Sequence, residues 1–317
     1  MNIALLEPLG VSAQMIEKLA EPLKREGHTF TYYPQRTTDP QELLKRSAGK
    51  DVVMIANTPY PNDVIRQLPE LKMIDVAFTG IDHIGQDACK AQGVTICNAA
   101  NYSNQTVAEL VIGLTLGLYR QIDETQHRVR TGGTAAGILD REIAGKTVGI
   151  VGTGRIGMMT AKLFHAFGAR LIAYSHNVHP EAATLGMTYM PLEQLMAEAD
   201  IVSIHTPNNP STKGMISKEM LALMKPTAIL INCARGPILD NQALAEALNS
   251  GKIAGAGIDV YDMEPPIPAD YPLLNAKNTL LTPHVAFASE ESMIRRAEIV
   301  FENLYAFLKK EPQNVCN

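Results

Sequence analysis

Residues 147–167 read TVGIVGTGRIGMMTAKLFHAF, and this stretch decides the fold of the region around it. The apolar run 147–151 is typical of a strand buried on both faces, and helical spacing follows Gly157. Between them, GTGRIG matches the G-x-G-x-x-G pattern, whose glycines permit a tight turn, close approach of a pyrophosphate and close helix–strand packing. The free N–H groups at the start of such a helix attract phosphate oxygens. We predict a dinucleotide-binding strand–turn–helix; the alternative is a glycine-rich turn without a ligand.

On both sides of this stretch, short apolar runs alternate with segments of helical length. Strand-like runs lie at 3–6, 29–33, 52–55, 71–78, 94–98, 171–174, 201–205, 228–232, 256–260 and 279–281. Two longer helices are predicted at about 104–120 and 289–308. Such alternation predicts an α/β protein with parallel sheets, and 317 residues make two domains the natural expectation.

Composition and charge limit the possible partners. The chain has 28 Lys+Arg against 33 Asp+Glu, a formal charge of −5, and no dense basic run, which argues against nucleic acid and anionic membranes. No apolar stretch approaches the roughly 20 residues of a membrane span, and the opening MNIALLEPLG lacks a secretory signal pattern. Four separated cysteines without a C-x-x-C pair predict reduced thiols, no metal site and a cytoplasmic protein: Cys89, Cys97, Cys233 and Cys316.

The choice between NAD and NADP is left open by the end of the second predicted strand of this unit. An NAD-preferring fold places an acid there, about 20 residues after the glycines, to bind the ribose. Here Ser175 occupies that place, and no arginine is adjacent to hold a 2′-phosphate. His176 or His179 is a candidate for a weaker contact, and the alternative is that both are exposed loop residues.

Three segments place a polar side chain just after a predicted strand, where open α/β sheets bind ligands. Arg235 can grip a carboxylate with two parallel N–H groups. His284 can exchange a proton near neutral pH, and a carboxylate such as Glu264 would orient and charge its ring. Together they fit the reduction of a 2-keto acid. Taken singly, each residue has a non-catalytic interpretation that is favoured over the catalytic one: Arg235 as a surface ion-pair partner, Glu264 as a solvated loop acid and His284 as a capped loop histidine.

The chain resembles the D-isomer-specific 2-hydroxyacid dehydrogenase family nearly from end to end. The matching motifs, in order, are VGIVGTGRIG at 148–157, HTPNNPST at 205–212, LINCARGPILDNQALAEAL at 230–248, AGAGIDVYDMEPP at 254–266 and LTPHVA at 281–286. The resemblance implies that Arg235 orients the substrate, His284 is the acid/base and Glu264 is the partner of that histidine.

The resemblance also implies a cofactor site for NAD or NADP. Gly152, Gly154, Arg155, Ile156 and Gly157 would surround the pyrophosphate, with Ser175 and His176 at the ribose. Asp259 would lie near the nicotinamide carboxamide. The adenosine side would be lined by His205, Thr206, Pro207 and Thr212, and the predicted cofactor set further includes Thr106, Cys233 and Ala234.

For the substrate, the resemblance implies a loop at Phe78, Thr79 and Gly80 whose backbone N–H groups hold the carboxylate. Asn57 would form another pocket wall. Tyr102 corresponds to a tyrosine of D-lactate-like members, and packing at a domain hinge is the alternative for it.

The implied architecture is a flavodoxin-like substrate domain, residues 1–100 and 285–317, and a Rossmann nucleotide-binding domain, residues 101–284. Homodimerisation through the nucleotide-binding domain is the family habit.

The expected reaction is hydride transfer between NAD(P)H and C2 of a small 2-keto acid of pyruvate, glyoxylate or hydroxypyruvate size. Two alternatives remain: a phosphite-type dehydrogenase of the same family, and a non-catalytic NAD(H)-sensing corepressor-like protein. Formate is disfavoured, because its oxidation needs no proton transfer of the kind that Glu264 and His284 would serve. The lack of appended tails or extra binding motifs argues against the corepressor.

Overall fold

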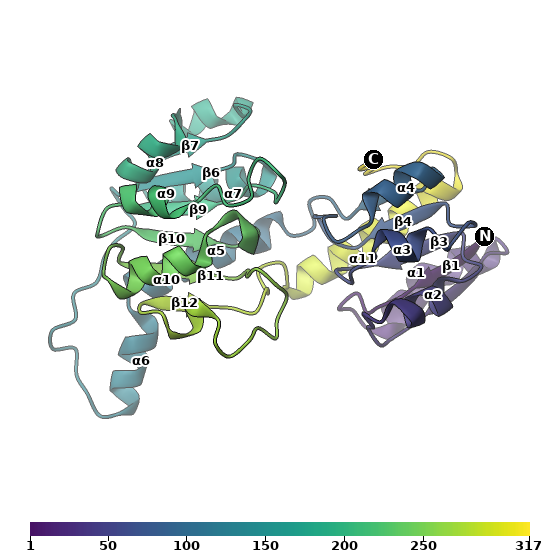
Figure 1. Cartoon of the computed structure of the whole chain (residues 1–317), viewed down its shortest axis with the longest axis horizontal. Helices are drawn as coiled ribbons and strands as arrows, with labels where there is room; N and C mark the ends of the chain where they lie inside the picture. The colour runs from purple at the N-terminus through teal and green to yellow at the C-terminus, as the bar shows by residue number, and fades with distance from the viewer. The chain divides into compact units, whose positions relative to one another are not determined.

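The structure is a computed structural model that describes residues 1–317, and it divides them into two compact units (Figure 1). Unit 1 comprises Met1–Ser103 and Ala288–Asn317, and unit 2 comprises Asn104–Phe287. Every strand pairing in both sheets is parallel. The predicted α/β class with two parallel sheets is therefore confirmed.

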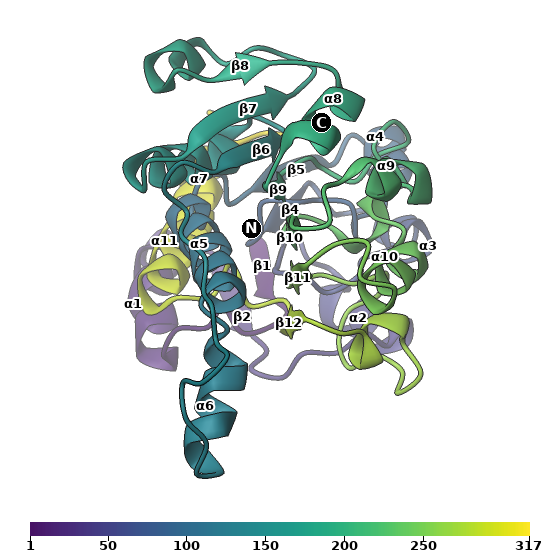
Figure 2. The same cartoon turned by 90° about the vertical axis from the view of Figure 1, so that its left-hand side faces the viewer.

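Unit 1 contains a five-stranded sheet in the order β2-β1-β3-β4-β5, which is the flavodoxin-like order. Helices α1 and α11 contact each other, and α3 contacts both α2 and α4; Figure 2 shows the two groups on opposite faces of the sheet. The strands are β1 (Asn2–Leu5), β2 (Thr29–Tyr32), β3 (Val52–Ile55), β4 (Met73–Val76) and β5 (Thr95–Asn98). The helices are α1 (Ala13–Arg25), α2 (Pro40–Ser47), α3 (Asn62–Ile65), α4 (Gln86–Gln92) and α11 (Glu290–Leu308).

Unit 2 contains a seven-stranded sheet in the order β12-β11-β10-β9-β6-β7-β8. The strand order reverses between β6 and β9, as in a Rossmann fold, and this switch point is where such sheets bind ligands. The strands are β6 (Thr147–Val151), β7 (Arg170–Tyr174), β8 (Thr188–Tyr189), β9 (Ile201–Ile204), β10 (Ile229–Asn232), β11 (Gly255–Ile258) and β12 (Thr279–Leu281). The helices are α5 (Asn104–Tyr119), α6 (Ile122–Arg130), α7 (Arg155–Ala166), α8 (Leu192–Glu198), α9 (Lys218–Leu223) and α10 (Asn241–Asn249), with 3-10 turns η1 (Pro180–Leu185), η2 (Gly236–Ile238) and η3 (Pro272–Asn275).

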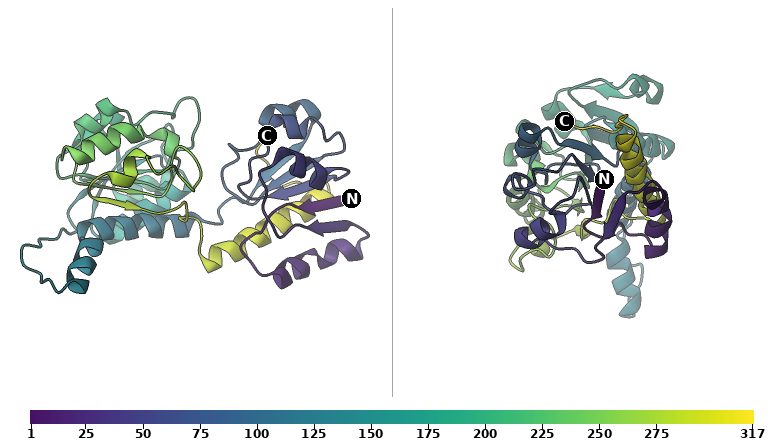
Figure 3. Two further views of the ribbon diagram at one scale, coloured as in Figure 1. Left: turned by 60° about the horizontal axis from the view of Figure 1, so that its bottom comes forward. Right: turned by 90° about the vertical axis from the view of Figure 1, so that its right-hand side faces the viewer.

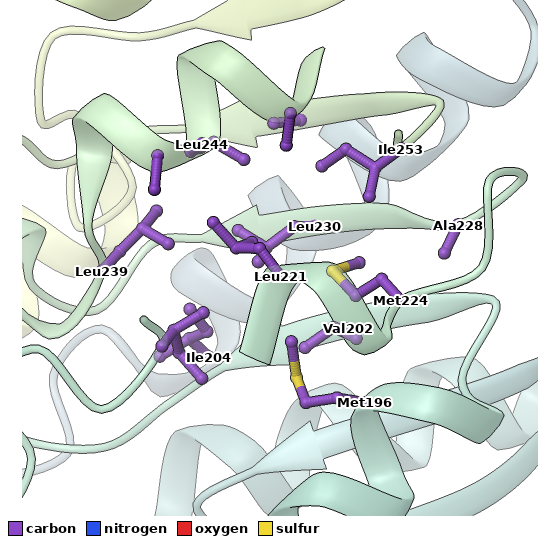
Figure 4. Close-up of a cluster of buried hydrophobic side chains, with 14 of the residues drawn as sticks. Met196, Val202, Ile204, Leu221, Met224, Ala228, Leu230, Leu239, Leu244 and Ile253 are labelled. Carbon is purple, nitrogen blue, oxygen red and sulfur yellow. The ribbon is translucent and has the colours of Figure 1, made fainter. Parts of the chain in front are cut away.

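Alternation along the strands of unit 2 divides its core into two layers. Val202 and Leu230 belong to the cluster under α8, α9 and α10 (Figure 4). Their chain neighbours Ile201 and Ile231 point to the opposite cluster, under α5 and α7. Each fully buried aliphatic side chain of this size contributes about 1.5–3 kcal/mol relative to an exposed one. The strands are almost continuously apolar in the sequence because both of their faces are buried.

Two features of unit 2 lie outside the predicted elements. Helix α6 has no buried residue, so it shows no apolar stripe for periodicity to detect. It extends away from the sheet together with the loop that follows it (Figure 3). Strand β8 is only two residues long and pairs with β7 alone. None of the helices has the length and apolar character that a membrane span requires.

The contact between the glycine turn and α7 depends on the absence of a side chain at Gly157. A Cβ atom added there would lie 2.0 Å from the carbonyl oxygen of Gly152, which is backbone and cannot yield easily. Gly113, in α5, is the opposite case, because a Cβ there would meet nothing within 4 Å. The first glycine therefore permits close packing, whereas the second is a helix-weakening residue with free space around it.

We expect Gly157→Ala to lower the free energy of unfolding by about 1–3 kcal/mol, the usual cost of overpacking. Gly113→Ala should leave it unchanged or raise it by about 0.5–1 kcal/mol through better helix propensity. Urea denaturation followed by circular dichroism measures both. Equal effects of the two substitutions would contradict the close contact at Gly157.

Candidate active site

The glycine turn after β6 leaves space beside an uncapped helix start. Gly152 adopts φ +97°, and its N–H donates to the Tyr174 carbonyl at 2.7 Å. Gly154 is the N-cap of α7 without a side-chain cap, and a Cβ at Gly154 would meet nothing within 4 Å. Arg155 is exposed in the first turn of α7, and Ile156 is half-buried. The turn therefore presents backbone N–H groups to open space, as a bound pyrophosphate requires.

The loop after β9 carries two buried polar atoms without a hydrogen-bond partner in the chain: Thr206 Oγ1 and Asn208 Oδ1. β9 is the neighbour of β6 in the sheet, so this loop follows the strand across the switch point from the glycine turn. Buried polar atoms are nearly always paired, so these two are available to hydrogen-bond a polar ligand. Together with the glycine turn, they fit a dinucleotide. Asn208 was absent from the predicted set, although it lies within the quoted HTPNNPST motif.

His205 is half-buried, and its ring is hydrogen-bonded within the chain. Its Nε2 lies 2.8 Å from Ser203 Oγ, and burial lowers the pKa of His205 from 6.5 to about 3. A Cβ at Gly152 would come within 2.9 Å of the His205 carbonyl carbon, so the residue also forms the floor of the glycine turn. His205 is therefore an uncharged residue that supports the glycine turn structurally.

Two other residues of this loop point back into the chain or to solvent. Thr212 Oγ1 donates to the Pro207 carbonyl at 2.5 Å and accepts from Asn209 N at 2.9 Å. Pro207 is exposed. Thr212 thus stabilises the loop, and its predicted contact with adenosine stays a prediction.

The turn after β7 contains Ser175, half-buried, followed by exposed His176. His179 is engaged elsewhere: its Nδ1 accepts from Glu181 N at 3.3 Å and caps η1. The turn is tied to the glycine loop, because Thr153 Oγ1 donates to the Asn177 carbonyl at 3.3 Å. Ser175 and His176 thus remain beside the glycine loop, whereas His179 acts as a helix cap.

His284 and Glu264 form a close pair in unit 2. His284 Nδ1 lies 2.9 Å from both carboxylate oxygens of Glu264. The His284 side chain is 12 % exposed and that of Glu264 is 50 % exposed, so the pair is reached by solvent from the carboxylate side. Phe287 contacts the imidazole edge-to-face, with ring centroids 5.6 Å apart. The ring is thereby held with Nδ1 toward the carboxylate.

Asp259 holds the backbone that carries His284. Its carboxylate accepts from Thr282 Oγ1 at 2.6 Å, Val285 N at 2.8 Å and Ala286 N at 2.9 Å. The side chain is fully buried, and burial raises the pKa of Asp259 against the opposing effect of these hydrogen bonds. His284 itself adopts φ +57°, and its N–H donates to the Asp259 carbonyl at 2.8 Å. The contact of Asp259 with a nicotinamide carboxamide stays a prediction. In the structure, Asp259 holds the loop that carries His284.

Arg235 follows β10 in a loop held by a buried asparagine. Asn232 Nδ2 donates to the Arg235 carbonyl, and Asn232 Oδ1 accepts from Ala234 N, both at 3.0 Å. Arg235 is half-buried, and one of its guanidinium nitrogens donates to the Ala234 carbonyl at 2.8 Å. Burial raises the pKa of Cys233 well above its ordinary value, so its thiol stays uncharged. Asn232 was not predicted, because nothing in its local pattern separates it from any strand-end polar residue.

Neighbouring loops bring the three candidate catalytic residues to one edge of the sheet. Gly236 packs against the loop after β11, where an added Cβ would lie 1.9 Å from the Tyr261 carbonyl oxygen. Asp262, two residues before Glu264, accepts from Asn241 Nδ2 at 2.9 Å and from Tyr271 OH at 2.8 Å. β10, β11 and β12 are successive neighbours, so Arg235, Glu264 and His284 follow the carboxyl ends of adjacent strands.

In unit 1 the predicted substrate residues follow β3, β4 and β5 at the corresponding edge. Phe78 and Tyr102 are both buried, with ring centroids 6.2 Å apart. Thr79 is exposed and Gly80 is half-buried, and no hydrogen bond within the chain uses the backbone N–H of either residue. Asn57 is half-buried. The packing of Tyr102 fits both of its predicted roles. Thr106 lies in the first turn of α5, in unit 2.

The fold and the glycine turn define the class: a dinucleotide-binding α/β protein with a histidine–carboxylate pair at the strand edge of unit 2. A family model described as "D-isomer specific 2-hydroxyacid dehydrogenase, NAD binding domain" matches residues 112–286. The chain belongs to this family and is an NAD(P)-dependent oxidoreductase.

Curated relatives and solved structures support the same family. A glycerate dehydrogenase of Methylorubrum extorquens is 39 % identical over 303 residues, covering 91 % of this chain and 92 % of the relative. A hydroxypyruvate reductase of Blautia hydrogenotrophica is 34 % identical over 302 residues, covering 93 % and 94 %. An acyclic imino acid reductase, Bsp5, solved with NADPH and D-Arg, matches with a TM-score of 0.91 and 28 % identity over 100 % of both chains.

We expect His205 to make folding stability pH-dependent. The folded-state pKa of about 3 lies below the ordinary 6.5, so the unfolded chain binds a proton that the folded chain does not. Its contribution is present above pH 6.5 and is lost as pH falls toward 3, by up to about 1.4 kcal/mol per pH unit. Urea denaturation between pH 7 and 5 should show a steeper loss in the wild type than in His205→Asn. Identical slopes would contradict the assignment.

Proposed function

We propose that this chain reduces the C2 carbonyl of a small 2-oxo acid, with hydroxypyruvate (giving the D-2-hydroxy acid) and glyoxylate (giving achiral glycolate) as the favoured substrates, and catalyses the reverse oxidation. The observation that carries this is the 2.9 Å pairing of His284 Nδ1 with Glu264, on a strand edge shared with Arg235. That pairing supplies an oriented proton donor. Reduction of a ketone needs such a donor, whereas binding of a hydride-carrying cofactor alone does not.

The names of the two curated relatives support the substrate choice. Glycerate is what hydroxypyruvate becomes when its C2 ketone is reduced, so a glycerate dehydrogenase and a hydroxypyruvate reductase share one substrate pair. Neither name supports the phosphite-type or the corepressor-like alternative. The predicted pocket stretches of this chain contain no added cationic cluster that a phosphorylated substrate would need.

The reaction divides among the three catalytic candidates as follows. Arg235 binds the substrate carboxylate with its planar fork and polarises the C2 oxygen. A nicotinamide held by the glycine turn would supply the hydride that C2 accepts. His284, held through Nδ1 by Glu264, gives a proton from Nε2 to the C2 oxygen, so ketone plus hydride plus proton becomes the hydroxy acid. In the oxidative direction the same nitrogen accepts that proton.

Unit 1 contributes substrate contacts in this proposal. The backbone N–H groups of Thr79 and Gly80, which no intrachain acceptor occupies, donate to the substrate carboxylate. Asn57, Phe78 and Tyr102 form the pocket wall around the substituent on C2, which is hydrogen in glyoxylate and a hydroxymethyl group in hydroxypyruvate. Hydrogen bonds from neutral N–H groups to a carboxylate are the stronger, charge-assisted kind.

For the cofactor, the glycine turn and the start of α7 hold the pyrophosphate, and Ser175 faces the ribose. Because no carboxylate stands there to repel a 2′-phosphate and no arginine to attract it, the enzyme accepts both NADH and NADPH. Thr206 and Asn208 donate to or accept from the bound dinucleotide, which pairs their buried atoms.

The test is oxidation of NADH and of NADPH, followed at 340 nm, against hydroxypyruvate, glyoxylate, pyruvate and a branched 2-keto acid. We expect the first two to give the highest kcat/KM. His284→Ala should lower kcat by about 100-fold or more, and Arg235→Lys should mainly raise KM, since an ammonium lacks the planar fork. Near-normal turnover of His284→Ala, or no turnover of any keto acid by the wild type, would overturn the proposal.

We further propose that α6 and the loop after it pair with the same region of a second copy of the chain. Ile122, Val129 and Leu139 are 54 %, 76 % and 89 % exposed in unit 2, an unusual concentration of bare aliphatic side chains. Leu139 itself lines a groove of about 710 Å³, together with Tyr119, Arg141 and Leu280. An arm that carries exposed aliphatic side chains next to a groove of the same molecule suits reciprocal exchange in a twofold dimer.

We expect the double variant Val129→Asp, Leu139→Asp to be monomeric at micromolar concentration and the wild type dimeric, because the charges would be buried unpaired in the interface. Size-exclusion chromatography with light scattering measures the mass. Val178→Asp, at a site 69 % exposed but outside this arm, is the matched control and should remain dimeric. A monomeric wild type, or an unchanged double variant, would contradict the arm's role.

A further inference from the structure

The free edge of the unit 1 sheet is covered by the last residues of the chain. β5 pairs with β4 on one side only. On its other side Asn98 N donates to the Asn314 carbonyl at 3.1 Å and Cys316 N donates to the Ile96 carbonyl at 2.8 Å. Asn317 adds two side-chain bonds at the start of β5, accepting from Ile96 N and donating to the Val94 carbonyl. The tail thus acts as a short antiparallel strand.

A chain of asparagine side chains leads inward from this tail. Asn314 Nδ2 donates to Asn303 Oδ1 at 2.8 Å. Asn303, fully buried on α11, donates through Nδ2 to Asp75 Oδ1 and to the Asn98 carbonyl, both at 3.0 Å. Burial raises the pKa of Asp75 well above 3.8, which favours its uncharged form at this site. Each amide orientation is fixed by its acceptors, which are carbonyl or carboxyl oxygens.

Asn98 carries the chain of contacts to the loop after β4. Its Nδ2 donates to the Thr79 carbonyl at 2.7 Å. The C=O of Thr79 and the N–H of Gly80 belong to one planar peptide unit, and in a trans peptide they point in opposite directions. Holding the carbonyl toward Asn98 therefore turns the Gly80 N–H away from Asn98, and no intrachain acceptor takes it.

We propose that Asn98 is a positioning residue that presents the Gly80 N–H to the substrate carboxylate, and that Asn303 and the tail at Asn314 keep Asn98 in place. This inference rests on the proposed function, in which the Thr79–Gly80 amides bind that carboxylate. Without the Asn98 donor, the exposed loop peptide can rotate, and the N–H must be ordered again each time substrate binds. The cost falls on substrate binding, and the proton-transfer pair in unit 2 is untouched.

The experiment compares four variants in steady-state kinetics, with the dissociation constant of NADH measured separately by fluorescence. Asn98→Ala removes the donor, and Asn98→Asp keeps the size but replaces N–H with oxygen. Asn314→Ala removes one supporting link. Asn317→Ala is the matched control, because it detaches the same tail from the same strand at the end away from Thr79.

We expect both Asn98 variants to raise the keto-acid KM by about 10- to 100-fold, the range for one hydrogen bond to a charged group. The fall in kcat should be smaller, and NADH binding should be unchanged. Asn314→Ala should raise KM by about 2- to 10-fold, the range for a neutral hydrogen bond. Asn317→Ala should lower Tm without changing KM.

A KM within twofold of wild type in Asn98→Ala overturns the positioning role while the wild type still reduces keto acids. So does an equal rise in KM in Asn317→Ala, because that would be a general effect of loosening the tail. If the Asn98 variants fail to fold, the comparison of Asn314→Ala with Asn317→Ala tests the inference by itself. Equal KM values in these two variants overturn it. A wild type inactive on every keto acid overturns the proposed function instead.

Discussion

Every strand in both sheets is parallel, and this constraint determines where chemistry can occur in the molecule. Parallel strands are buried on both faces by the helices that connect them, so their side chains pack in the core. Their carboxyl ends, however, meet at one edge, where loops from distant parts of the sequence become neighbours. Arg235, Glu264 and His284 share an edge for this reason alone, although 49 positions separate the first from the last.

The loops at these edges are shaped by buried polar side chains. Asp259 holds residues 282–286, Asn232 holds the Arg235 loop, and Asn303 holds the end of β5. Such groups are costly to bury, and they persist where each oxygen or N–H finds a backbone partner. Once satisfied, they fix a loop more precisely than apolar packing does, because a hydrogen bond depends on direction as well as distance. The candidate catalytic side chains thus lie in loops that buried polar side chains hold in place.

Close contacts between backbone segments are the second feature that fixes these loops. At Gly157 and Gly236 an added Cβ would lie within 2.0 Å of a carbonyl oxygen from another turn. These contacts fix α7 against the glycine turn and the loop after β10 against the loop after β11. They let the site be built from rigid strand ends, with short connections that have little freedom to lose when a ligand binds.

The sequence by itself determined the α/β class, the glycine turn and the family, because periodicity and short motifs depend on neighbours along the chain. The helices at 104–119 and 290–308 lie within one residue of their predicted ranges for the same reason. Helix α6, the buried Asn232 and Asn208, and the link from Asn303 to Asn98 needed the tertiary structure. Residues 98 and 303 are 205 positions apart, and which polar side chains meet across that separation depends on how α11 packs on the sheet. No local pattern encodes that packing, since a buried asparagine on a helix looks in the sequence like an exposed one.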